Sequence, residues 1–595
     1  FCLLAYFAES YRGLFGEKLY NYHLGAGLDG TQTLSLDKFR SFCALACVAD
    51  AVGRFFEGEG VFNLYEDVWF SMRSRLLGDC VNKWFKKVAD ADKGKAFDEM
   101  LAYWPTWLVA DAVARRYWNH PDQAFVSLNL SSCRSIKKPE IHTVAMYYHK
   151  VTGGGVEKVI QLLTPLWISM GYQVVIITDV QGPEDAFSFP EGVVLRAVPN
   201  GGVGKPYGYI QRARAFSRIM HEEQVDALVY HAWNTALLPW DMLTVKAAGS
   251  AFLVYCHSVF SMRVLLGQAY FSMMPPTFGF ADGVVCLSDA DKAFWCRFNA
   301  NTHVVLNPIE WLSFGTGENL QMRDPNQVLW VGRLESEKHP EEALRIFSSV
   351  LRILPDARLG LLGKAPSEDA QANLEKFARE LGIEGSVEFL GFHDDPAPFY
   401  KKASVFLCTS EYEGLPLSIL EALAAGLPVV MYDLSYLTIV QNNESIVPVP
   451  FGDADMAADE LVGLLADTER RERLSRCARS YAQNLASYDY AEVWEGVFSS
   501  LGELHQPPVV DASERLMWDT LLRHYAMGIT KLVQQRDAAR RGGCGGGSEI
   551  ERIHKSASYR IGRTITWPAR KIRTLIECVN EHGLSYTVRV YLKRG

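Results

Sequence analysis

Short apolar runs recur along the middle of this chain, and helix-like stretches separate them. The first series is HTVAMYY, QVVIIT, VVLRAV, ALVYHA, FLVYCH, GVVCLS and HVVLN; the second is QVLWVGR, ARLGLLG, VEFLG, SVFLC, PVVMY and SIVPV. Such runs, alternating with helical patterns, are typical of parallel β-strands that helices cover on both faces. Two successive series predict two doubly wound α/β domains that face a cleft.

Other textures flank these two series. The N-terminal zone is rich in aromatic residues and in helix-period patterns, and SSCRSIKKPE after it is predicted to be a linker. The predicted organisation is a mostly helical accessory region at 1–135, α/β domains at 141–306 and 307–480, closing helices at 481–540, a Gly-rich linker at 541–548 and a basic tail at 549–595.

Composition excludes several classes of protein. The formal net charge of −9 argues against a dedicated nucleic-acid binder. The twelve cysteines show no zinc spacing and suit a reducing cytosol; we expect Cys43 and Cys47 to be buried thiols. No long uninterrupted apolar run occurs, so we predict no transmembrane helix. The chain begins with Phe rather than Met, and we expect it to be a piece of a longer protein.

The ends of the predicted strands carry polar residues, and ligands of open α/β sheets bind there. In KVTGGGVEKV, Gly154 and Gly155 lead into a helix whose bare amides suit an anion, although a tight turn alone would also explain them. His257 follows a strand and is either structural or functional. Ser288 is predicted to cap a helix, and Asn307 with Pro308 to form a turn.

The second domain places two cations after its first strand. In VGRLESEKHPEE, Arg333 follows the strand directly and Lys338 precedes a helix. Two fixed cations at the mouth of a cleft can hold a diphosphate, whereas solvated surface charges are the plainer alternative.

The segment SEYEGLPLSILEALAAGLPVV is the most informative one. Glu413 lies on a loop, Gly414 is expected to permit a sharp bend, and Pro416 suits the first turn of a helix. Glu421 lies inside that apolar helix, where a carboxylate needs a hydroxyl or amide partner. A sugar diol would supply one, and the free amides of residues 414–417 would favour an anion.

At these residues the sequence resembles the retaining GT-B glycosyltransferases of family 4. VGRLESEK, EGLPLSILE with its Glu-x7-Glu spacing, and GGGVEKV are similar to motifs of that family, and the resemblance runs from about Val144 to Leu501. It implies a GT-B fold and an enzyme that transfers a hexosyl or related group from a nucleotide-sugar. The turn at Asn307 and the Lys364 in LLGKAP depart from the family pattern.

The resemblance also implies roles for individual residues. Arg333 and Lys338 would neutralise the leaving diphosphate, Glu413 would contact the donor sugar and Glu421 the ribose. The implied catalytic residues are Glu413, His257, Arg333 and Lys338; the implied donor-binding residues are Gly154, Gly155, Arg333, Lys338, Glu413, Gly414, Leu415, Pro416, Leu417 and Glu421.

The chemistry implied by this site needs no metal or cofactor. Charge that develops on a leaving diphosphate can be stabilised by two cations and a helix N-terminus. Two segments match an Asp-x-Asp metal motif by letter, at 90–92 and 289–291, but we expect both to lie on the surface. A glycosidase scheme with two carboxylates is not expected for Glu413 and Glu421.

The flanking zones suggest further partners. Part of 1–135 resembles the region that follows the catalytic domain in some bacterial family 2 glycosyltransferases. From residue 551 on, the tail has ten Lys or Arg against three Glu, which suits either an anionic membrane surface or a solvated end.

The sequence therefore predicts a glycosyltransferase of bacterial surface polysaccharide synthesis that acts on a glycan or lipid-linked acceptor. We expect it to be cytoplasmic or peripheral on the inner face of the plasma membrane. Other GT-B enzymes, such as an epimerase or a phosphorylase, and a non-catalytic partner subunit are the alternatives. The phosphorylase is disfavoured because no lysine stands in a context typical of pyridoxal phosphate.

Overall fold

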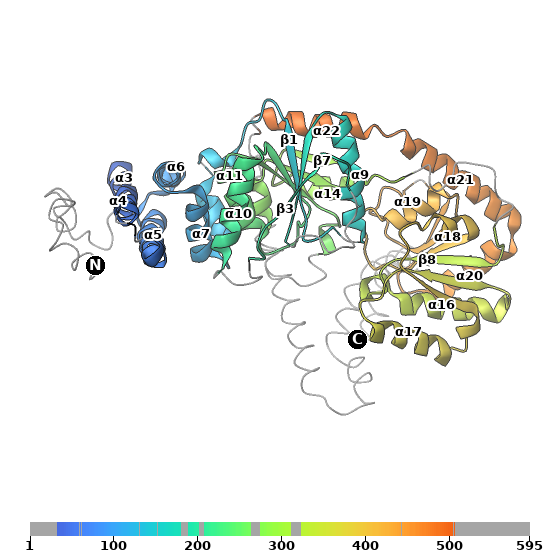
Figure 1. Ribbon diagram of the computed structural model, residues 1–595. Coiled ribbons are helices and arrows are strands. Elements are labelled where there is room, and N and C mark those ends of the chain that lie inside the picture. The colour runs from blue at the N-terminus through green and yellow to red at the C-terminus, as the bar shows by residue number, and fades with distance from the viewer. Residues whose placement is uncertain are drawn as a thin grey trace, which may run out of the picture. The chain divides into compact units, whose positions relative to one another are not determined.

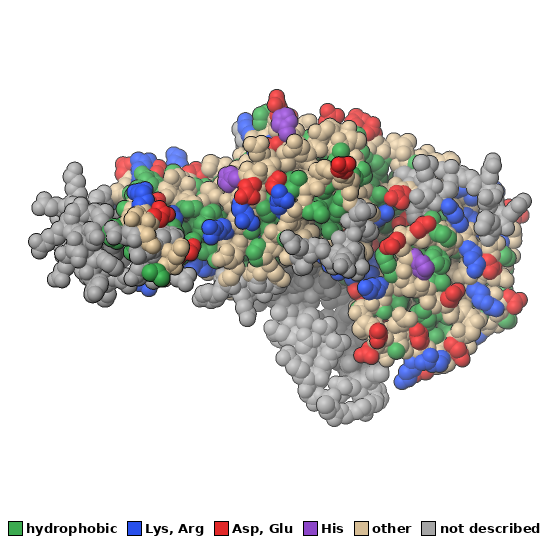
Figure 2. Space-filling view, in the orientation of Figure 1, with side chains coloured by type: hydrophobic (Ala, Val, Ile, Leu, Met, Phe, Trp, Pro, Cys, Tyr) green, Lys and Arg blue, Asp and Glu red, His purple; other side chains and the backbone are tan. Residues whose placement is uncertain are grey.

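A computed structural model describes residues 33–505, apart from 59, 61, 130, 152, 180–188, 202–207, 263–273, 311–322, 442 and 504. Except for Ser261 and Met262, these residues fall in one compact unit. The predicted linker at 541–548 and the basic tail lie outside the described residues, as does most of the region predicted to form closing helices. Figure 2 shows acidic and basic side chains interspersed on the visible face of the described residues.

The N-terminal region is helical, as predicted. Its helices are α3 (Leu36–Cys43), α4 (Leu45–Gly58), α5 (Phe62–Lys87), η1 (Asp90–Asp92), α6 (Lys93–Tyr103), α7 (Thr106–Tyr117), α8 (Pro121–Leu128) and η2 (Ser132–Arg134). Cys43 is buried, but Cys47 is exposed, so the expectation of two buried thiols was wrong for Cys47. The spacing of the two cysteines would correspond to about one turn of a single helix. Cys43 instead ends α3 and Cys47 lies on α4, and only Cys43 faces the helical core.

The first α/β domain is built on a sheet of parallel strands covered by helices (Figure 1). The strand order of this sheet is β3-β2-β1-β4-β5-β6-β7. Its strands are β1 (Thr143–Tyr147), β2 (Gln173–Thr178), β3 (Val194–Ala197), β4 (Ala227–Tyr230), β5 (Ala251–Tyr255), β6 (Gly283–Cys286) and β7 (Thr302–Val304). Its helices are α9 (Gly155–Ser169), α10 (Tyr209–Glu222), α11 (Leu238–Ala247), α13 (Met274–Phe280) and α14 (Asp289–Trp295). The order reverses direction between β1 and β4, which makes the carboxyl ends of these strands the expected ligand site.

The second α/β domain repeats this plan with the order β10-β9-β8-β11-β12-β13. Its strands are β8 (Gln327–Val331), β9 (Arg358–Leu362), β10 (Val387–Gly391), β11 (Val405–Cys408), β12 (Val429–Tyr432) and β13 (Ile446–Val449). Its helices are η5 (Ser336–Lys338), α16 (Pro340–Ile353), α17 (Glu368–Glu380), η6 (Glu384–Ser386), α18 (Ala397–Lys402), α19 (Leu417–Ala424), α20 (Ala454–Ala466) and α21 (Thr468–Ala486). The topological switch here lies between β8 and β11.

Each apolar run of the sequence thus became a strand, because helices cover the central strands on both faces and leave no polar side to the sheet. The predicted fold class, with two parallel Rossmann-like sheets and a helical N-terminal region, is confirmed. Two further helices, α22 (Tyr490–Ser499) and η7 (Ser500–Gly502), close the described chain. Among the described helices, none combines the length and the apolar character that crossing a membrane requires.

The predicted linker at 131–140 is docked rather than free. Its backbone bonds to Asp282, which accepts from the amide of Ile136 at 2.9 Å. The ammonium of Lys246 donates to Asp282 at 2.9 Å and to the carbonyl of Arg134 at 3.2 Å. Helix α7 of the N-terminal region packs against α10 and α11 of the first α/β domain. The helical region and this domain therefore share one packed interface.

Asp282 holds this junction together, so we predict that Asp282→Ala destabilises the protein strongly. Lys246 would be left buried without its carboxylate, which costs about 3–5 kcal/mol. Chemical unfolding followed by circular dichroism measures the change. The matched control is Glu222→Ala, which breaks an exposed ion pair with Arg218 and should change stability by about 0.5 kcal/mol or less. Equal effects of the two substitutions would contradict the prediction.

Candidate active site

The switch point of the second sheet brings three of the predicted site residues together. Arg333 and Lys338 lie on the loop after β8, and Glu413 lies on the loop after β11. Because β8 and β11 are adjacent parallel strands, their loops meet at one edge of the sheet. There Lys338 Nζ donates to Glu413 Oε1, and both side chains are largely buried.

Hydrogen bonds hold these two loops in register. Thr409 Oγ1 donates to the carbonyl of Lys338 at 2.7 Å and accepts from the indole of Trp330 at 2.9 Å. The hydroxyl of Tyr436 bonds to both the amide and the carbonyl of Glu413, each at 2.9 Å. The ion pair is therefore preorganised by side chains that sequence reasoning missed. Thr409 follows β11 directly, and this strand-end position was its available signal.

Arg333 is a half-exposed cation that is paired within its own loop. Its guanidinium pairs with Glu335 and Glu337 on its own loop, and its side chain is 58% exposed. Burial raises the pKa of Glu335, as does the hydrogen bond with Glu337 beside it. Ion pairs this exposed are weak. An incoming polyanion could therefore draw Arg333 away from these two carboxylates.

Glu421 lies on α19 apart from the ion pair. The hydroxyl of Tyr400 donates to Glu421 Oε2 at 2.8 Å. The hydroxyl partner that the sequence required is therefore supplied by the protein itself. Burial raises the pKa of Glu421 to about 7 in spite of this hydrogen bond. Pro416 stands at the N-cap of α19 rather than inside its first turn.

Gly414 lies at a bend of the chain, as expected, and it also permits a close approach of two backbone segments. It is absent from the glycines with a left-handed φ among the described residues. A Cβ placed on Gly414 would lie 2.6 Å from the carbonyl oxygen of His257 and 2.9 Å from the Cα of Ser258. Next to it, the carbonyl of Leu415 accepts from Asn307 Nδ2 at 2.8 Å. Asn307 therefore ties the Glu413 loop to the connection between the two sheets.

His257 follows β5 and is paired with a second histidine. Nδ1 of His231 lies 2.8 Å from Nε2 of His257, and the ring of Tyr255 stacks on His257. Burial lowers the pKa of His257 to about 3 and that of His231 also well below its ordinary value. Both rings are therefore neutral at physiological pH and suit hydrogen bonding rather than proton transfer. Sequence reasoning missed His231, although it directly follows β4.

The glycine loop of the first domain already holds a carboxylate. Gly154 precedes α9 in an extended conformation, and α9 begins at Gly155. A Cβ on Gly154 would lie 2.8 Å from Cδ of Glu157, so this side chain covers the loop. Burial raises the pKa of Glu157, although Lys150 and Arg333 oppose the shift. The carboxyl of Glu157 thus occupies the place where the sequence suggested an anion.

The two Asp-x-Asp segments differ in their exposure. Asp90 is exposed, as expected, and pairs with Lys93. Asp291, however, is buried and accepts from the hydroxyl of Ser288 and the amide of Phe260, so the surface expectation was wrong there. Ser288 caps α14 as predicted. The described residues contain no group of three or more His, Cys, Asp or Glu side chains arranged to hold a metal ion.

Comparisons with known proteins cover these two domains. The family described as Glycosyltransferase Family 4 matches residues 153–310, and the family Glycosyl transferases group 1 matches residues 317–481. An uncharacterized glycosyltransferase of Haemophilus influenzae is 24% identical over 58% of this chain and 96% of its own length. A poly(glycerol-phosphate) α-glucosyltransferase of Bacillus subtilis is 27% identical, but the match spans 29% of this chain and only 26% of that protein.

Solved structures share the fold at low sequence identity. Staphylococcus aureus TarM covers 61% of this chain and 100% of its own, with a TM-score of 0.50 and 11% identity. Anabaena HepE in complex with UDP and glucose has the same coverage, a TM-score of 0.51 and 16% identity. The two family matches and the two switch-point sheets together place residues 153–481 of this chain among the glycosyltransferases with the GT-B fold.

Proposed function

We propose that this protein transfers a sugar, with retention, from a nucleotide-sugar donor to a glycan or lipid-linked acceptor in bacterial surface polysaccharide synthesis. The observation that carries the proposal is the Lys338–Glu413 pair beside Arg333 at the switch point of the second sheet. This arrangement offers cations to a leaving group and a carboxylate to a sugar within one rigid frame.

The proposed roles follow from the charges that the reaction creates. Breaking the bond between the anomeric carbon and the phosphate leaves negative charge on the nucleoside diphosphate. Lys338 and Arg333 would stabilise that charge, and the amides at the start of α19 would add to it. Glu413 would accept hydrogen bonds from the donor sugar and Glu421 from the ribose. His257, held neutral by burial, would donate or accept one hydrogen bond at the reacting sugar.

Related proteins support the biological setting. The relatives include the B. subtilis α-glucosyltransferase named above and a lipopolysaccharide core glycosyltransferase of Rhizobium meliloti, 37% identical over 20% of this chain and 35% of that protein. HepE was solved with UDP and glucose, which makes a UDP-sugar the first donor to test. We also propose that the basic tail contacts an anionic membrane surface on the cytoplasmic side. The N-terminal region would be the remnant of a preceding transferase.

Two other functions remain in competition with this one. An epimerase would act on a nucleotide-sugar without a second substrate, and a partner subunit would bind no donor. Incubation with UDP-, GDP- and ADP-sugars, followed by assay of free nucleoside diphosphate and by a measurement of donor binding, separates all three functions. Release of a diphosphate supports the transferase, whereas binding without release favours the epimerase.

We predict that Glu413→Ala and Arg333→Ala each lower turnover by about 10²-fold or more, the scale of losing an electrostatic stabiliser. Steady-state release of nucleoside diphosphate measures the effect. Glu460→Ala removes a comparable ion pair with Arg470 elsewhere in the same domain, and Arg345→Ala removes an equally exposed arginine. Both controls should retain turnover. Wild-type turnover in a site variant would remove that residue from the site.

Glu421→Gln should raise stability at high pH and weaken donor binding. The folded pKa of about 7 exceeds the ordinary 4.5, so between these values the folded protein keeps a proton that the unfolded chain has lost. Wild-type stability therefore falls as pH rises through this window, by about 3 kcal/mol at most. The variant, being neutral, should be the more stable protein at pH 8 but not at pH 4. Donor affinity should fall about 10-fold.

Thermal unfolding at both pH values and calorimetric titration with the nucleoside diphosphate measure these two effects. A variant that binds the diphosphate as tightly as the wild type would exclude Glu421 from the donor site. A stability difference that does not change with pH would contradict the raised pKa.

Chelation of divalent metals should leave activity intact, because the proposed charge stabilisation uses only protein groups. The measurement is diphosphate release before and after treatment with EDTA and desalting. Loss of activity that Mg²⁺ or Mn²⁺ restores would show that a metal takes part.

A further inference from the structure

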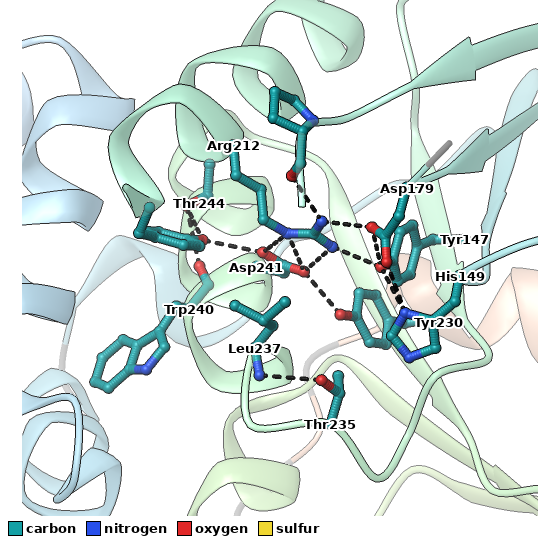
Figure 3. A network of polar contacts seen from close by, with 12 residues as sticks. Tyr147, His149, Asp179, Arg212, Tyr230, Thr235, Leu237, Trp240, Asp241 and Thr244 are labelled. Carbon is teal, nitrogen blue, oxygen red and sulfur yellow. Dashed lines mark hydrogen bonds and ion pairs between the residues drawn. The ribbon is translucent and has the colours of Figure 1, made fainter. Parts of the chain in front are cut away.

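The first α/β domain carries a buried polar network at the carboxyl ends of its central strands (Figure 3). Tyr147 ends β1 and Tyr230 ends β4, while Asp179 directly follows β2. Helices α10 and α11 contribute Arg212 and Asp241. This edge is the switch point of the first sheet, where open α/β sheets bind ligands.

The inner half of the network is complete by itself. Arg212 is fully buried and bonds to Asp241 through Nε at 2.9 Å and through Nη2 at 2.7 Å. The hydroxyls of Tyr230 and Tyr209 also donate to Asp241, at 2.7 and 3.1 Å. One guanidinium and one carboxylate therefore neutralise each other and are satisfied by hydrogen bonds.

Asp179 adds a second carboxylate to a guanidinium that is already neutralised. Its Oδ1 accepts from Arg212 Nη1 and, at 2.6 Å, from the hydroxyl of Tyr147. Burial by itself would raise the pKa of Asp179. The hydrogen bond with His149 and the charge of Arg212 together outweigh that effect, so the pKa lies below its ordinary value. Arg212 can neutralise only one of the two carboxylates. Burying the second one in its ionised form costs free energy unless a further hydrogen-bond donor compensates its charge.

The imidazole of His149 supplies this further hydrogen bond to Asp179. Its Nδ1 lies 2.7 Å from Asp179 Oδ2, and its side chain is 40% exposed, whereas that of Asp179 is only 8% exposed. Figure 3 shows the ring at the rim of the network. Because Asp179 is ionised, it selects the tautomer with the proton on Nδ1. In the neutral ring with this tautomer, the lone pair is on Nε2, across the ring from the network.

His149 lies on the loop between β1 and α9, the same loop that contains Gly154. Lys150, the residue after His149, and Arg333 carry charges that lower the pKa of the buried Glu157. Glu157 covers the glycine loop, and Arg333 belongs to the loop that we propose to hold the diphosphate. A substrate bound against His149 would therefore lie next to the donor.

We propose that His149 is an acceptor-binding residue whose Nε2 accepts a hydrogen bond from a non-reacting hydroxyl of the acceptor sugar. Asp179 is its positioning residue, and Arg212 with Tyr147 fixes Asp179 in turn. This inference rests on the proposed function, since it needs a second, hydroxylated substrate. It predicts that His149 affects transfer to a sugar but not hydrolysis of the donor by water.

The test compares two rates in the full chain: donor hydrolysis alone, and its acceleration by a panel of methyl glycosides of common hexoses and N-acetylhexosamines. His149→Ala should lower kcat/KM for the accelerating glycoside by about 10-fold, the loss of one hydrogen bond, and leave hydrolysis unchanged. The control is His142→Ala, a more exposed histidine before β1, which should change neither rate. With the monodeoxy glycoside that lacks the contacted hydroxyl, the variant and the wild type should become equal.

A second variant tests the positioning role. Asp179→Asn would donate to Nδ1 and move the imidazole proton to Nε2, which histidine side-chain ¹⁵N NMR detects. Transfer should fall as in His149→Ala, and thermal unfolding checks that the variant is folded. If it is not folded, the comparison of His149→Ala with the deoxy glycosides decides.

The outcomes separate the two proposals. A wild type that neither binds nor hydrolyses any nucleotide-sugar would refute the proposed function, and this inference with it. A wild type that hydrolyses the donor without responding to any glycoside would overturn the acceptor role alone. So would a His149→Ala protein whose hydrolysis and transfer fall together, or whose transfer is unchanged.

Discussion

The pairing of two parallel strands, β8 and β11, is the constraint on which the candidate site depends. These strands are far apart in the sequence, and each is followed by a loop that carries charge. Their adjacency at the switch point brings Lys338 against Glu413 and leaves Arg333 at the rim. The first sheet repeats the same arrangement with β1 and β4, whose ends carry His149 and His231. Both halves of the proposed chemistry therefore arise from one topological feature.

Burial and neighbouring charges set the protonation states of the titratable groups at these sheet edges. His257 is neutral because its ring is removed from water, and Glu421 holds its proton near neutral pH for the same reason. Asp179 is also buried but stays ionised, because His149 and Arg212 lie against it. Two buried carboxyl groups of one chain, Glu421 and Asp179, therefore differ in the direction of their pKa shifts. The neighbouring hydrogen-bond donors and charges account for the difference.

Sequence patterns predicted the fold well because a parallel strand covered on both faces must be continuously apolar. They also located the strand-end residues, since polar groups directly after such strands stand out. They did not predict the partners of these residues. Each partner is distant in sequence from the residue that it holds. The three pairs are Tyr400 with Glu421, Tyr436 with Glu413, and Asp179 with His149. The bend at Gly414 was predicted correctly, but its close contact with the backbone of His257 was not.

The sequence by itself determined two Rossmann-like sheets, a helical N-terminal region and the strand-end positions of Arg333, Lys338, Glu413 and Glu421. These features depend on local periodicity and on short motifs, which are written along the chain. Only the tertiary structure decided which charges are paired, which histidines are neutral and that the segment at 131–140 is docked on Asp282. Such properties depend on desolvation and on contacts between distant segments, and neither is encoded in any one stretch of sequence.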